Sequence, residues 1–223
     1  MLYFIPTPIW NKEDITLRAL RLLKELKVIL AEDTRTTRKL LSMYEISTSD
    51  KQLLAFTSFT DGGKMQHYLN LLQGQDVALV SEAGTPGLSD PGKSMIQLCN
   101  ENNIPFTILP GANALVPAIV GAGFDTTEFT FLGFFPAKKW RQTLIKKILA
   151  SEYPTFFYES VHRIEKTLED FKALWFVGKV SICREASKMF EQFVTWTLDE
   201  VLDMIAKKKL PIKGEFVVGI KND

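Results

Sequence analysis

The chain has 223 residues and a mass of 25.3 kDa, of which 46% are hydrophobic and 24% are charged. This length fits one large domain or two domains of about 100 residues each, and the composition is that of a globular protein. No stretch approaches the roughly 20 apolar residues that cross a bilayer, so a membrane protein is not expected. The net charge of +1 gives no sign of a nucleic-acid binder that works through bulk charge.

The amino-terminal stretch and the two cysteines bear on location and metal binding. The stretch MLYFIPTPIW is apolar but has no basic start and no long hydrophobic middle, so we expect no signal peptide and a cytoplasmic protein. Cys99 and Cys183 lie far apart, with no CxxC or Cys/His cluster near either. We therefore expect two buried thiols, no disulfide and no metal site.

Short apolar runs alternate with helically spaced residues through the first half. Apolar residues recur at helical spacing between Ile15 and Leu26 and again between Met65 and Leu72. Asp14 and Asp90 are expected to cap the helices that follow them. This alternation is typical of βαβ units, which build a mostly parallel sheet with helices on both faces. The predicted strands are Leu2–Ile5, Val28–Ala31, Leu53–Phe56, Val77–Val80 and Phe106–Leu109.

The second half has a different order of elements. Strand follows strand directly near the carboxyl terminus, which predicts a mixed sheet rather than a second parallel one. The predicted strands are Thr130–Phe134, Thr155–Tyr158, Val180–Arg184, Phe190–Thr197 and Gly214–Ile220, and the predicted helices are Lys138–Ala150, Val161–Leu174 and Leu198–Lys207.

A Pro- and Gly-containing stretch, LPGANALVP, separates the two halves after the fifth predicted strand. The expected fold class is therefore α/β with two α/β domains. Residues 1–112 form an amino-terminal domain with a mostly parallel sheet, and residues 113–223 form a carboxyl-terminal domain with a mixed sheet.

The longest irregular loop, SEAGTPGLSDPG, runs from Ser81 to Gly92 after a predicted strand. Ligands of open α/β sheets bind at the carboxyl ends of the strands, where loops are free to be irregular. Gly84 and Gly87 let the main chain approach a ligand, while Pro86 restricts the loop. Loops of this length and composition are more often functional than simple connections, so we expect a ligand-binding loop.

Two further loops have the same character. IPTPIWNKEDIT follows the first predicted strand and LPGANAL follows the fifth, so three strand ends are expected to wall one cleft. The sequence lacks the fingerprints of two common nucleotide-binding folds. The one GxG, Gly121–Gly123, follows a helical stretch rather than a strand, and no GKS or GKT follows a glycine loop. A classical dinucleotide fold and a P-loop enzyme are therefore not expected.

Eight ordered blocks cover the chain from Leu2 to Ile220. They are YFIPTPIWNKEDITLRAL, AEDTRTTRKLL, VSEAGTPGLSDPG, LPGANAL, GFFPAK, FYESVHRI, REASKMFEQF and KGEFVVGI. Together they resemble the tetrapyrrole methylase superfamily, and most closely its branch of small-subunit ribosomal RNA cytidine 2′-O-methyltransferases. The resemblance implies an S-adenosylmethionine-dependent methyltransferase and a homodimer. It also implies a cofactor held between the two α/β domains and ribosomal RNA or the small ribosomal subunit as partner.

The cofactor contacts of that family can be carried onto the matching positions of this chain. Much of the contact is main chain and apolar surface, which suits a ligand with an adenine face and a positively charged sulfonium. The residues that the resemblance implies are Ile9, Thr85, Leu88, Asn113, Ala114, Tyr158, Glu185 and Gly214.

The chain departs from the RNA branch at several places. Trp10 stands where the branch usually has Gly, Glu82 stands where it has Asp, and TSFTDGGK replaces a loop with His and Asn. The chain ends at Asp223, whereas many members of the branch carry a further domain. Two alternatives stay open: methylation of a small molecule such as a tetrapyrrole, and a catalytically silent cofactor-binding module.

Methyl transfer to a ribose hydroxyl gains from a general base, and four residues at predicted strand ends are candidates for the catalytic site. Asp33 and Arg35 follow the second strand, where a helix cap with an ion pair is the competing interpretation. His162 lies just past a strand end, close in sequence to Glu159. Arg184 ends another strand and is expected either to bind a phosphate or to pair with Glu159.

Basic clusters occur at residues 34–39, 137–142 and 206–213. Each is more typical of a solvated helix face than of a phosphate contact. The run FTFLGFF, which begins at Phe129, alternates at strand spacing, and this favours core or dimer interface over base stacking.

Overall fold

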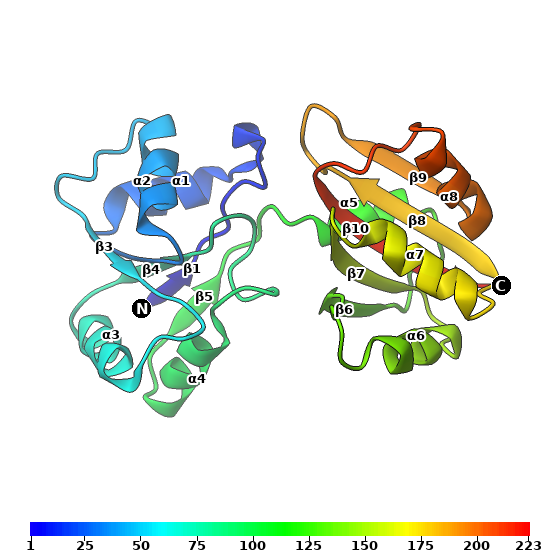
Figure 1. Ribbon diagram of the computed structural model, residues 1–223. Coiled ribbons are helices and arrows are strands. Elements are labelled where there is room, and N and C mark those ends of the chain that lie inside the picture. The colour runs from blue at the N-terminus through cyan, green and yellow to red at the C-terminus, as the bar shows by residue number, and fades with distance from the viewer. The chain divides into compact units, whose positions relative to one another are not determined.

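The computed structural model describes residues 1–223, which form two compact units, Met1–Asn113 and Ala114–Asp223. We call them unit 1 and unit 2. Each unit has one five-stranded sheet and its own hydrophobic core (Figure 1). The sequence-based boundary lies one residue before the one that separates these units.

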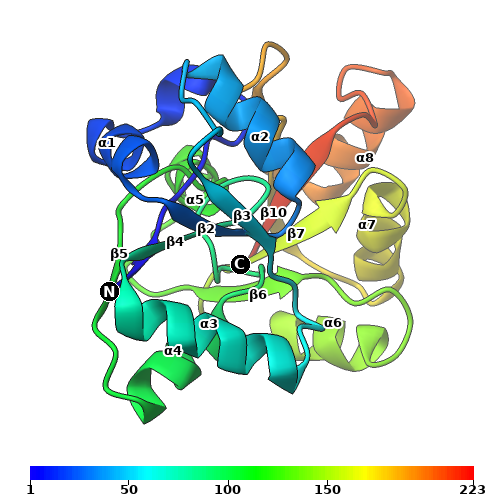
Figure 2. The same ribbon diagram turned by 90° about the vertical axis from the view of Figure 1, so that its left-hand side faces the viewer.

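Unit 1 is built on a parallel sheet with the strand order β3-β2-β4-β1-β5. The strands are β1 (Leu2–Phe4), β2 (Val28–Ala31), β3 (Gln52–Ala55), β4 (Val77–Val80) and β5 (Phe106–Ile108). The helices are the short 3-10 helix η1 (Lys12–Asp14), α1 (Leu17–Glu25), α2 (Thr34–Met43), α3 (Gly62–Gly74) and α4 (Lys93–Glu101). Helices α1 and α2 cover one face and α3 and α4 the other (Figure 2). The predicted parallel α/β architecture is confirmed.

Two predicted helix caps in unit 1 are wrong. Asp14 ends η1 rather than capping α1, because the Thr16 hydroxyl takes that place and accepts a hydrogen bond from the Ala19 amide at 3.1 Å. Asp90 does not cap α4, which begins after Gly92 without any side-chain cap. Thr16 is closer to the first helical turn than Asp14 is, so it reaches the free amides that a cap must satisfy.

Unit 2 is built on a mixed sheet with the strand order β6-β7-β10-β8-β9. Strands β6 and β7 are parallel and the other neighbours are antiparallel, which confirms the prediction. The strands are β6 (Thr130–Phe134), β7 (Thr155–Ser160), β8 (Gly178–Arg184), β9 (Gln192–Thr197) and β10 (Glu215–Asn222). The helices are α5 (Leu115–Gly121), α6 (Arg141–Leu149), α7 (Ile164–Ala173) and α8 (Leu198–Ala206).

Helices α6, α7 and α8 pack on one face of this sheet, and α5 lies against β8 and β10 on the other (Figure 1). Helices α6 and α7 each begin three residues later than the sequence predicted. Trp140 has a left-handed φ of 69°, which a right-handed helix cannot include, so α6 begins only at the next residue. The interpretation of residues 137–142 as a helix face is therefore wrong for Lys138 and Lys139, which lie in a loop.

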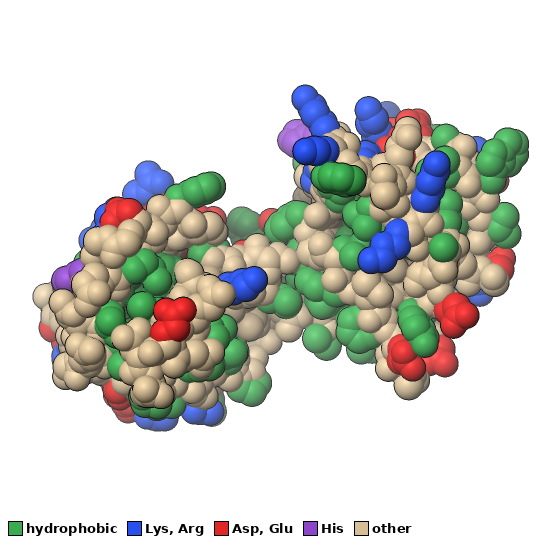
Figure 3. Space-filling model, turned by 90° about the horizontal axis from the view of Figure 1, so that it is seen from below, with side chains coloured by type: hydrophobic (Ala, Val, Ile, Leu, Met, Phe, Trp, Pro, Cys, Tyr) green, Lys and Arg blue, Asp and Glu red, His purple; other side chains and the backbone are tan.

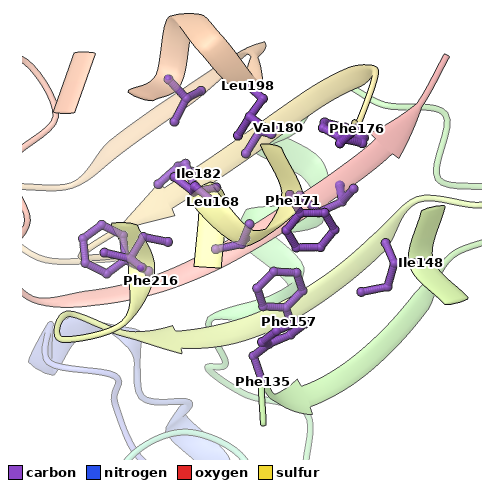
Figure 4. Close-up of a cluster of buried hydrophobic side chains, with 14 of the residues drawn as sticks. Phe135, Ile148, Phe157, Leu168, Phe171, Phe176, Val180, Ile182, Leu198 and Phe216 are labelled. Carbon is purple, nitrogen blue, oxygen red and sulfur yellow. The ribbon is translucent and has the colours of Figure 1, made fainter. Parts of the chain in front are cut away.

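Phenylalanine rings and aliphatic side chains together form the core between the unit 2 sheet and helices α6, α7 and α8 (Figure 4). Phe157 of β7 and Phe171 of α7 stack with ring centroids 6.4 Å apart, and Phe135 lies 4.5 Å from Phe157. The Phe-rich run therefore divides between core and surface. Phe135 is buried, whereas Phe129 and Phe134 are 43% and 62% exposed.

The two cysteines are buried free thiols, as predicted, with Cys99 in unit 1 and Cys183 in unit 2. Burial raises the pKa of the Cys183 thiol to about 12, so it stays protonated at neutral pH. None of the helices combines the length and apolar character needed to cross a bilayer. No three His, Cys, Asp or Glu side chains are grouped as metal ligands.

Candidate functional site

The loops that follow β1, β4 and β5 are joined to one another within unit 1. Thr7 and Gly84 form an antiparallel bridge, with main-chain hydrogen bonds of 2.9 and 3.0 Å that link the first loop to the second. The Thr85 hydroxyl donates to the Ala112 carbonyl at 3.1 Å and links the second loop to the third. Three loops that are far apart in sequence therefore form one assembly at the carboxyl ends of the strands.

Two glycines permit this assembly. Gly84 has a left-handed φ of 79°, and a Cβ at this position would lie 3.3 Å from the Ile9 side chain and 3.4 Å from the Ala112 carbonyl. A Cβ on Gly111 would lie only 2.4 Å from Pro6. These positions need glycine because protein atoms of the neighbouring loop, not a ligand, occupy the space beside them.

The main chain at Gly87 is open by contrast. Gly87 has a φ of 88° and is exposed, and nothing lies within 4 Å of the place where its Cβ would be. Next to it Leu88 is half-buried, as is Ile9 in the first loop. The assembly thus offers bare main chain and partly exposed apolar side chains. Of the residues that the sequence analysis singled out, it brings together Ile9, Thr85, Leu88 and Asn113.

An acidic group lies at the same edge of the sheet, because β2 and β4 are neighbouring strands and each is followed by carboxylates. Burial raises the pKa of Asp90 to about 6, and repulsion by Glu32 and Glu82 adds to the shift. Burial also raises the pKa of Glu32. From the sequence alone, Asp90 is expected only to cap a helix. The pairing of β2 with β4 is the missing information, since it places residues 32, 82 and 90 close together.

Asp33 and Arg35 form the arrangement that the sequence analysis gave as the competing interpretation. The Asp33 carboxylate caps α2 through the Arg35 amide at 2.7 Å and also pairs with the Arg35 guanidinium at 2.7 Å. These hydrogen bonds lower the pKa of Asp33 to about 2. A carboxylate held in this way is a poor proton acceptor at neutral pH, which favours a capping role over a role as base.

In unit 2, Glu185 and Gly214 lie against each other. Gly214 has a φ of 89°, and a Cβ there would lie 2.1 Å from a carboxylate oxygen of Glu185. That oxygen accepts hydrogen bonds from the Lys188 ammonium at 2.7 Å and the Glu215 amide at 2.9 Å. Burial works to raise the pKa of Glu185, but these hydrogen bonds outweigh it and the pKa is lowered. The space beside Gly214 is thus filled by Glu185.

Tyr158 and His162 lie near the end of β7. The Tyr158 ring lies between two phenylalanines of β6, with centroids 5.1 Å from Phe131 and 5.2 Å from Phe134. His162 is exposed in the turn between β7 and α7. Ala114 opens unit 2 as the residue before α5.

The predicted pairing of Arg184 with Glu159 is wrong. Arg184 is 7% exposed, and its guanidinium donates to the carbonyls of Lys213 at 2.7 Å and Phe190 at 2.9 Å. The Glu159 side chain is fully buried and pairs instead with Arg163 at 2.8 Å. Arg163 lies in the turn that follows β7, four residues after Glu159.

Comparison with known proteins identifies the family. Residues 1–202 match the model of the tetrapyrrole (corrin/porphyrin) methylases. The whole chain is 39% identical to a ribosomal RNA small subunit methyltransferase I from Halalkalibacterium halodurans, of which it covers 76%. It is 40% identical to the protein of the same name from Hydrogenobaculum, of which it covers 96%.

The fold also resembles a solved structure. The uroporphyrin-III C-methyltransferase from Thermus thermophilus, complexed with S-adenosylhomocysteine, matches with a TM-score of 0.64 and 15% identity, over 99% of this chain and 96% of that one. At this identity the likeness concerns the fold alone. The sequence matches carry the assignment: the chain belongs to the tetrapyrrole methylase family and is an S-adenosylmethionine-dependent methyltransferase.

Proposed function

We propose that this methyltransferase modifies ribosomal RNA of the small subunit at a ribose 2′-hydroxyl. The observation that carries the proposal is the match over the full chain, at 39% and 40% identity, to two bacterial proteins named as small-subunit ribosomal RNA methyltransferases. The two sequence features that suggested a silent module are not packed among the joined loops of unit 1, since Trp10 is 66% exposed and Glu82 is exposed as well.

The three loops of unit 1 fit the methyl donor. Open main chain at Gly87 and partly exposed Ile9 and Leu88 suit an adenosyl group, which binds largely to apolar and main-chain atoms. The carboxylates of Glu32 and Glu82 favour a cation at this edge of the sheet. When bound, S-adenosylmethionine supplies a methyl group already activated by its sulfonium. The family contacts in unit 2, at Ala114, Tyr158, Glu185 and Gly214, stay predictions.

The chain itself must position the acceptor hydroxyl and take up its proton. Positioning of this kind lowers a barrier by roughly 7 to 11 kcal/mol in well-oriented reactions. Among the four catalytic candidates, Asp33, Arg35 and Arg184 are engaged in hydrogen bonds with the protein. His162 is exposed, and imidazole is the side chain most often used as a general base. We therefore propose His162 as the base.

Donor binding is tested by calorimetry with S-adenosylmethionine and with S-adenosylhomocysteine. Thr85→Trp places a bulky ring among the three loops and should abolish binding. Thr85→Ser keeps the hydroxyl that reaches Ala112 and serves as the matched control, with affinity close to wild type. Unchanged affinity in Thr85→Trp would mean that the methyl donor does not bind among these loops.

The acceptor is tested by transfer of labelled methyl to small ribosomal subunits from cells that lack the enzyme, with uroporphyrinogen III as the parallel substrate. Label should appear in the subunits, and mass spectrometry of digested RNA should find it in a 2′-O-methyl nucleoside. Label in a base would overturn the ribose assignment. Label in the porphyrinogen alone would establish the small-molecule alternative.

The base is tested with His162→Ala and His162→Gln. Loss of a general base lowers kcat by about 10²- to 10⁴-fold. Donor affinity should stay unchanged, and the acidic limb of the pH–rate profile should disappear. A kcat within a factor of about two of wild type would exclude this role.

We also propose that the protein is a cytoplasmic homodimer, as expected from its sequence. Unit 2 exposes large apolar side chains that an interface would cover, including Val120 at 75%, Phe134 at 62% and Trp196 at 52%. Sedimentation equilibrium should give twice the monomer mass of 25.3 kDa. A monomer at micromolar concentration would contradict the dimer.

A further inference from the structure

The loop between β6 and α6 has buried ends and an exposed tip. Phe135 and Arg141 at its ends are 1% and 7% exposed. Between them every residue from Ala137 to Trp140 is exposed. The sequence pattern of this segment predicts a solvated helix face, and nothing in the proposed methyl-transfer site uses it.

Two arginines hold the ends of this loop. Arg163 donates to the Phe135 carbonyl at 3.0 Å, and Arg141 donates to the Pro136 carbonyl at 3.1 Å. Both guanidinium groups are paired with acids, Arg163 with Glu159 at 2.8 Å and Arg141 with Asp170 at 2.5 Å. The arginines are therefore occupied in fixing the loop, and the tip is held in place without using any of its own side chains.

Trp140 at the tip has a backbone that helix formation does not explain. It occupies the N-cap position of α6, where residues normally have extended backbone and a side chain that accepts a hydrogen bond. Trp140 has a left-handed φ of 69°, makes no cap and is 68% exposed. Trp175 also has a positive φ, but it follows α7 in the usual helix-ending turn, with Phe176 N bonded to the Phe171 carbonyl. An unfavourable conformation that exposes a large ring points to a role for that ring.

Positive charge surrounds Trp140. The Lys139 ammonium lies 5.6 Å from the centre of its ring, and Lys138 is exposed beside it. Residues 136–151 contain five basic side chains and no acidic one. Figure 3, seen from the side on which α6 lies, shows Lys and Arg side chains spread over unit 2. An exposed aromatic ring among unpaired lysines is how proteins bind single-stranded nucleic acid, through base stacking and phosphate contacts.

We propose that residues 137–140 form an RNA-binding loop, in which Trp140 stacks on an unpaired base and Lys138 and Lys139 contact the flanking phosphates. The proposal rests on the proposed function, since the loop would bind the ribosomal RNA substrate. It concerns binding of the acceptor strand and not the chemistry of transfer. A ring and two ammonium groups carry no code for a particular base, so the loop binds single strands with little sequence preference.

Binding is measured with the full chain by fluorescence anisotropy, using a labelled single-stranded RNA of about 12 nucleotides. Trp140→Ala should raise Kd by about 5- to 150-fold, the range for loss of one stacked base, and Trp140→Phe should restore most of the affinity. Trp175→Ala is the matched control, because Trp175 is also exposed and also has a positive φ. It should bind as wild type does.

The lysines are tested by salt dependence. For single strands, each phosphate contact contributes about 0.7 to the slope of log affinity against log salt. The double variant Lys138→Ala/Lys139→Ala should therefore lower the slope by about 1.4, whereas Trp140→Ala should leave it unchanged. Lys208→Ala/Lys209→Ala, which removes two exposed lysines beyond the end of α8, is the control for net charge and should keep the slope.

Kinetics with small ribosomal subunits separate this proposal from the proposed function. The loop variants should raise KM for the subunits with kcat unchanged, since they remove uniform binding. If wild type methylates the subunits but the loop variants keep its KM and Kd, the loop proposal fails and the function stands. If wild type fails to bind the RNA, the loop proposal fails as well. If wild type binds RNA through this loop but never methylates subunits, the proposed acceptor is wrong and the loop proposal survives.

The variants must fold for these results to count. Trp140 and the two lysines are exposed, so their replacement should move the melting temperature by no more than about 2 °C. Amide exchange in β6 and α6 should match wild type, which shows that Arg141 and Arg163 still hold the loop ends.

Discussion

The two units hold their functional loops by different means. In unit 1 the loops after β1, β4 and β5 are joined mostly through main-chain hydrogen bonds, as between Thr7 and Gly84. In unit 2 the loops after β6 and β7 are joined by charged side chains, chiefly Arg141 and Arg163 around the buried Glu159. Loops joined through the main chain need glycines, because a side chain would clash with the neighbouring loop. Loops joined through charged side chains need each buried charge to have a partner of opposite sign. The two designs should therefore respond to different substitutions.

The largest expected effect is in unit 2, where the buried ion pair can be compared with an exposed one in unit 1. Arg163 pairs with the fully buried Glu159, and Arg21 pairs with Glu25 on the surface of α1; both pairs join residues four apart. Arg163→Met removes the closer of the two guanidinium groups that face the buried Glu159 carboxylate and should cost about 3–5 kcal/mol of unfolding free energy. Arg21→Met should cost less than about 0.5 kcal/mol. Urea denaturation measures both.

A double variant shows whether the loss comes from the unpaired charge. Glu159→Leu together with Arg163→Met removes both charges and should recover part of the stability that Arg163→Met loses. If the double variant is as unstable as the sum of the two single variants, the stabilising contribution lies in the packing of these side chains and not in their pairing.

The next largest effect is expected at the acidic group of unit 1, where a substitution should raise the unfolding free energy instead of lowering it. The pKa of Asp90 is about 6 in the folded protein, above its ordinary value of 3.8. Folding is therefore accompanied by uptake of a proton when the pH lies between these two values. Stability therefore falls as the pH rises through this range. Asp90→Asn removes the cost of burying this charge, together with its repulsion by Glu32 and Glu82, and should stabilise the protein at pH 7.5 by ~1–3 kcal/mol.

The pH dependence identifies the cause of that gain. It should shrink steeply as the pH falls toward 4, where the folded carboxyl is protonated and the unfolded one, with its ordinary pKa of 3.8, is about half protonated. Glu101→Gln, at an exposed position of α4, is the control and should show no comparable gain. Thermal denaturation across this pH range measures both variants, and a gain in Asp90→Asn that persists unchanged at pH 4 would contradict the electrostatic explanation.

Main-chain joining in unit 1 is tested at Gly84. A Cβ there would lie 3.3 Å from the Ile9 side chain, and alanine would have to adopt the left-handed φ of 79°. Gly84→Ala should therefore lower the unfolding free energy by about 1–2 kcal/mol. It should also weaken donor binding, because it disturbs the bridge to Thr7. Gly74→Ala at the end of α3 is the matched control, since nothing lies within 4 Å of its Cβ position. Urea denaturation and calorimetry should distinguish the two variants clearly.

The same difference explains how much could be predicted from sequence. The ten strands and the loops of unit 1 were predictable, because apolar runs and Pro/Gly turns are local patterns. The charged network of unit 2 was not, because Arg141 of α6 is distant in sequence from Glu159 and Arg163, and only the fold brings its guanidinium to the Glu159 carboxylate. Trp140 shows the limit most clearly. Its neighbours have helical spacing, and only the structure shows the left-handed φ of 69° with which Trp140 stays outside the helix.

The smallest expected effects compare one helix cap from each unit. Thr16 caps α1 by accepting one hydrogen bond, whereas Thr197 caps α8 in a reciprocal arrangement, in which Glu200 also accepts from the Thr197 amide at 3.0 Å. Thr→Ala at an N-cap costs about 1 kcal/mol, and the reciprocal cap should place Thr197→Ala above Thr16→Ala.

The two caps should also differ in their response to acid. Hydrogen bonds from Thr197 lower the pKa of Glu200, so their contribution is present at neutral pH and is lost as the pH falls through that lowered value. The cost of Thr197→Ala should therefore decrease on acidification, while the cost of Thr16→Ala, which involves no carboxylate, should stay constant. Denaturation of both variants at neutral and acidic pH measures this. Equal pH dependence in the two would mean that the Glu200 carboxylate does not contribute to the cap.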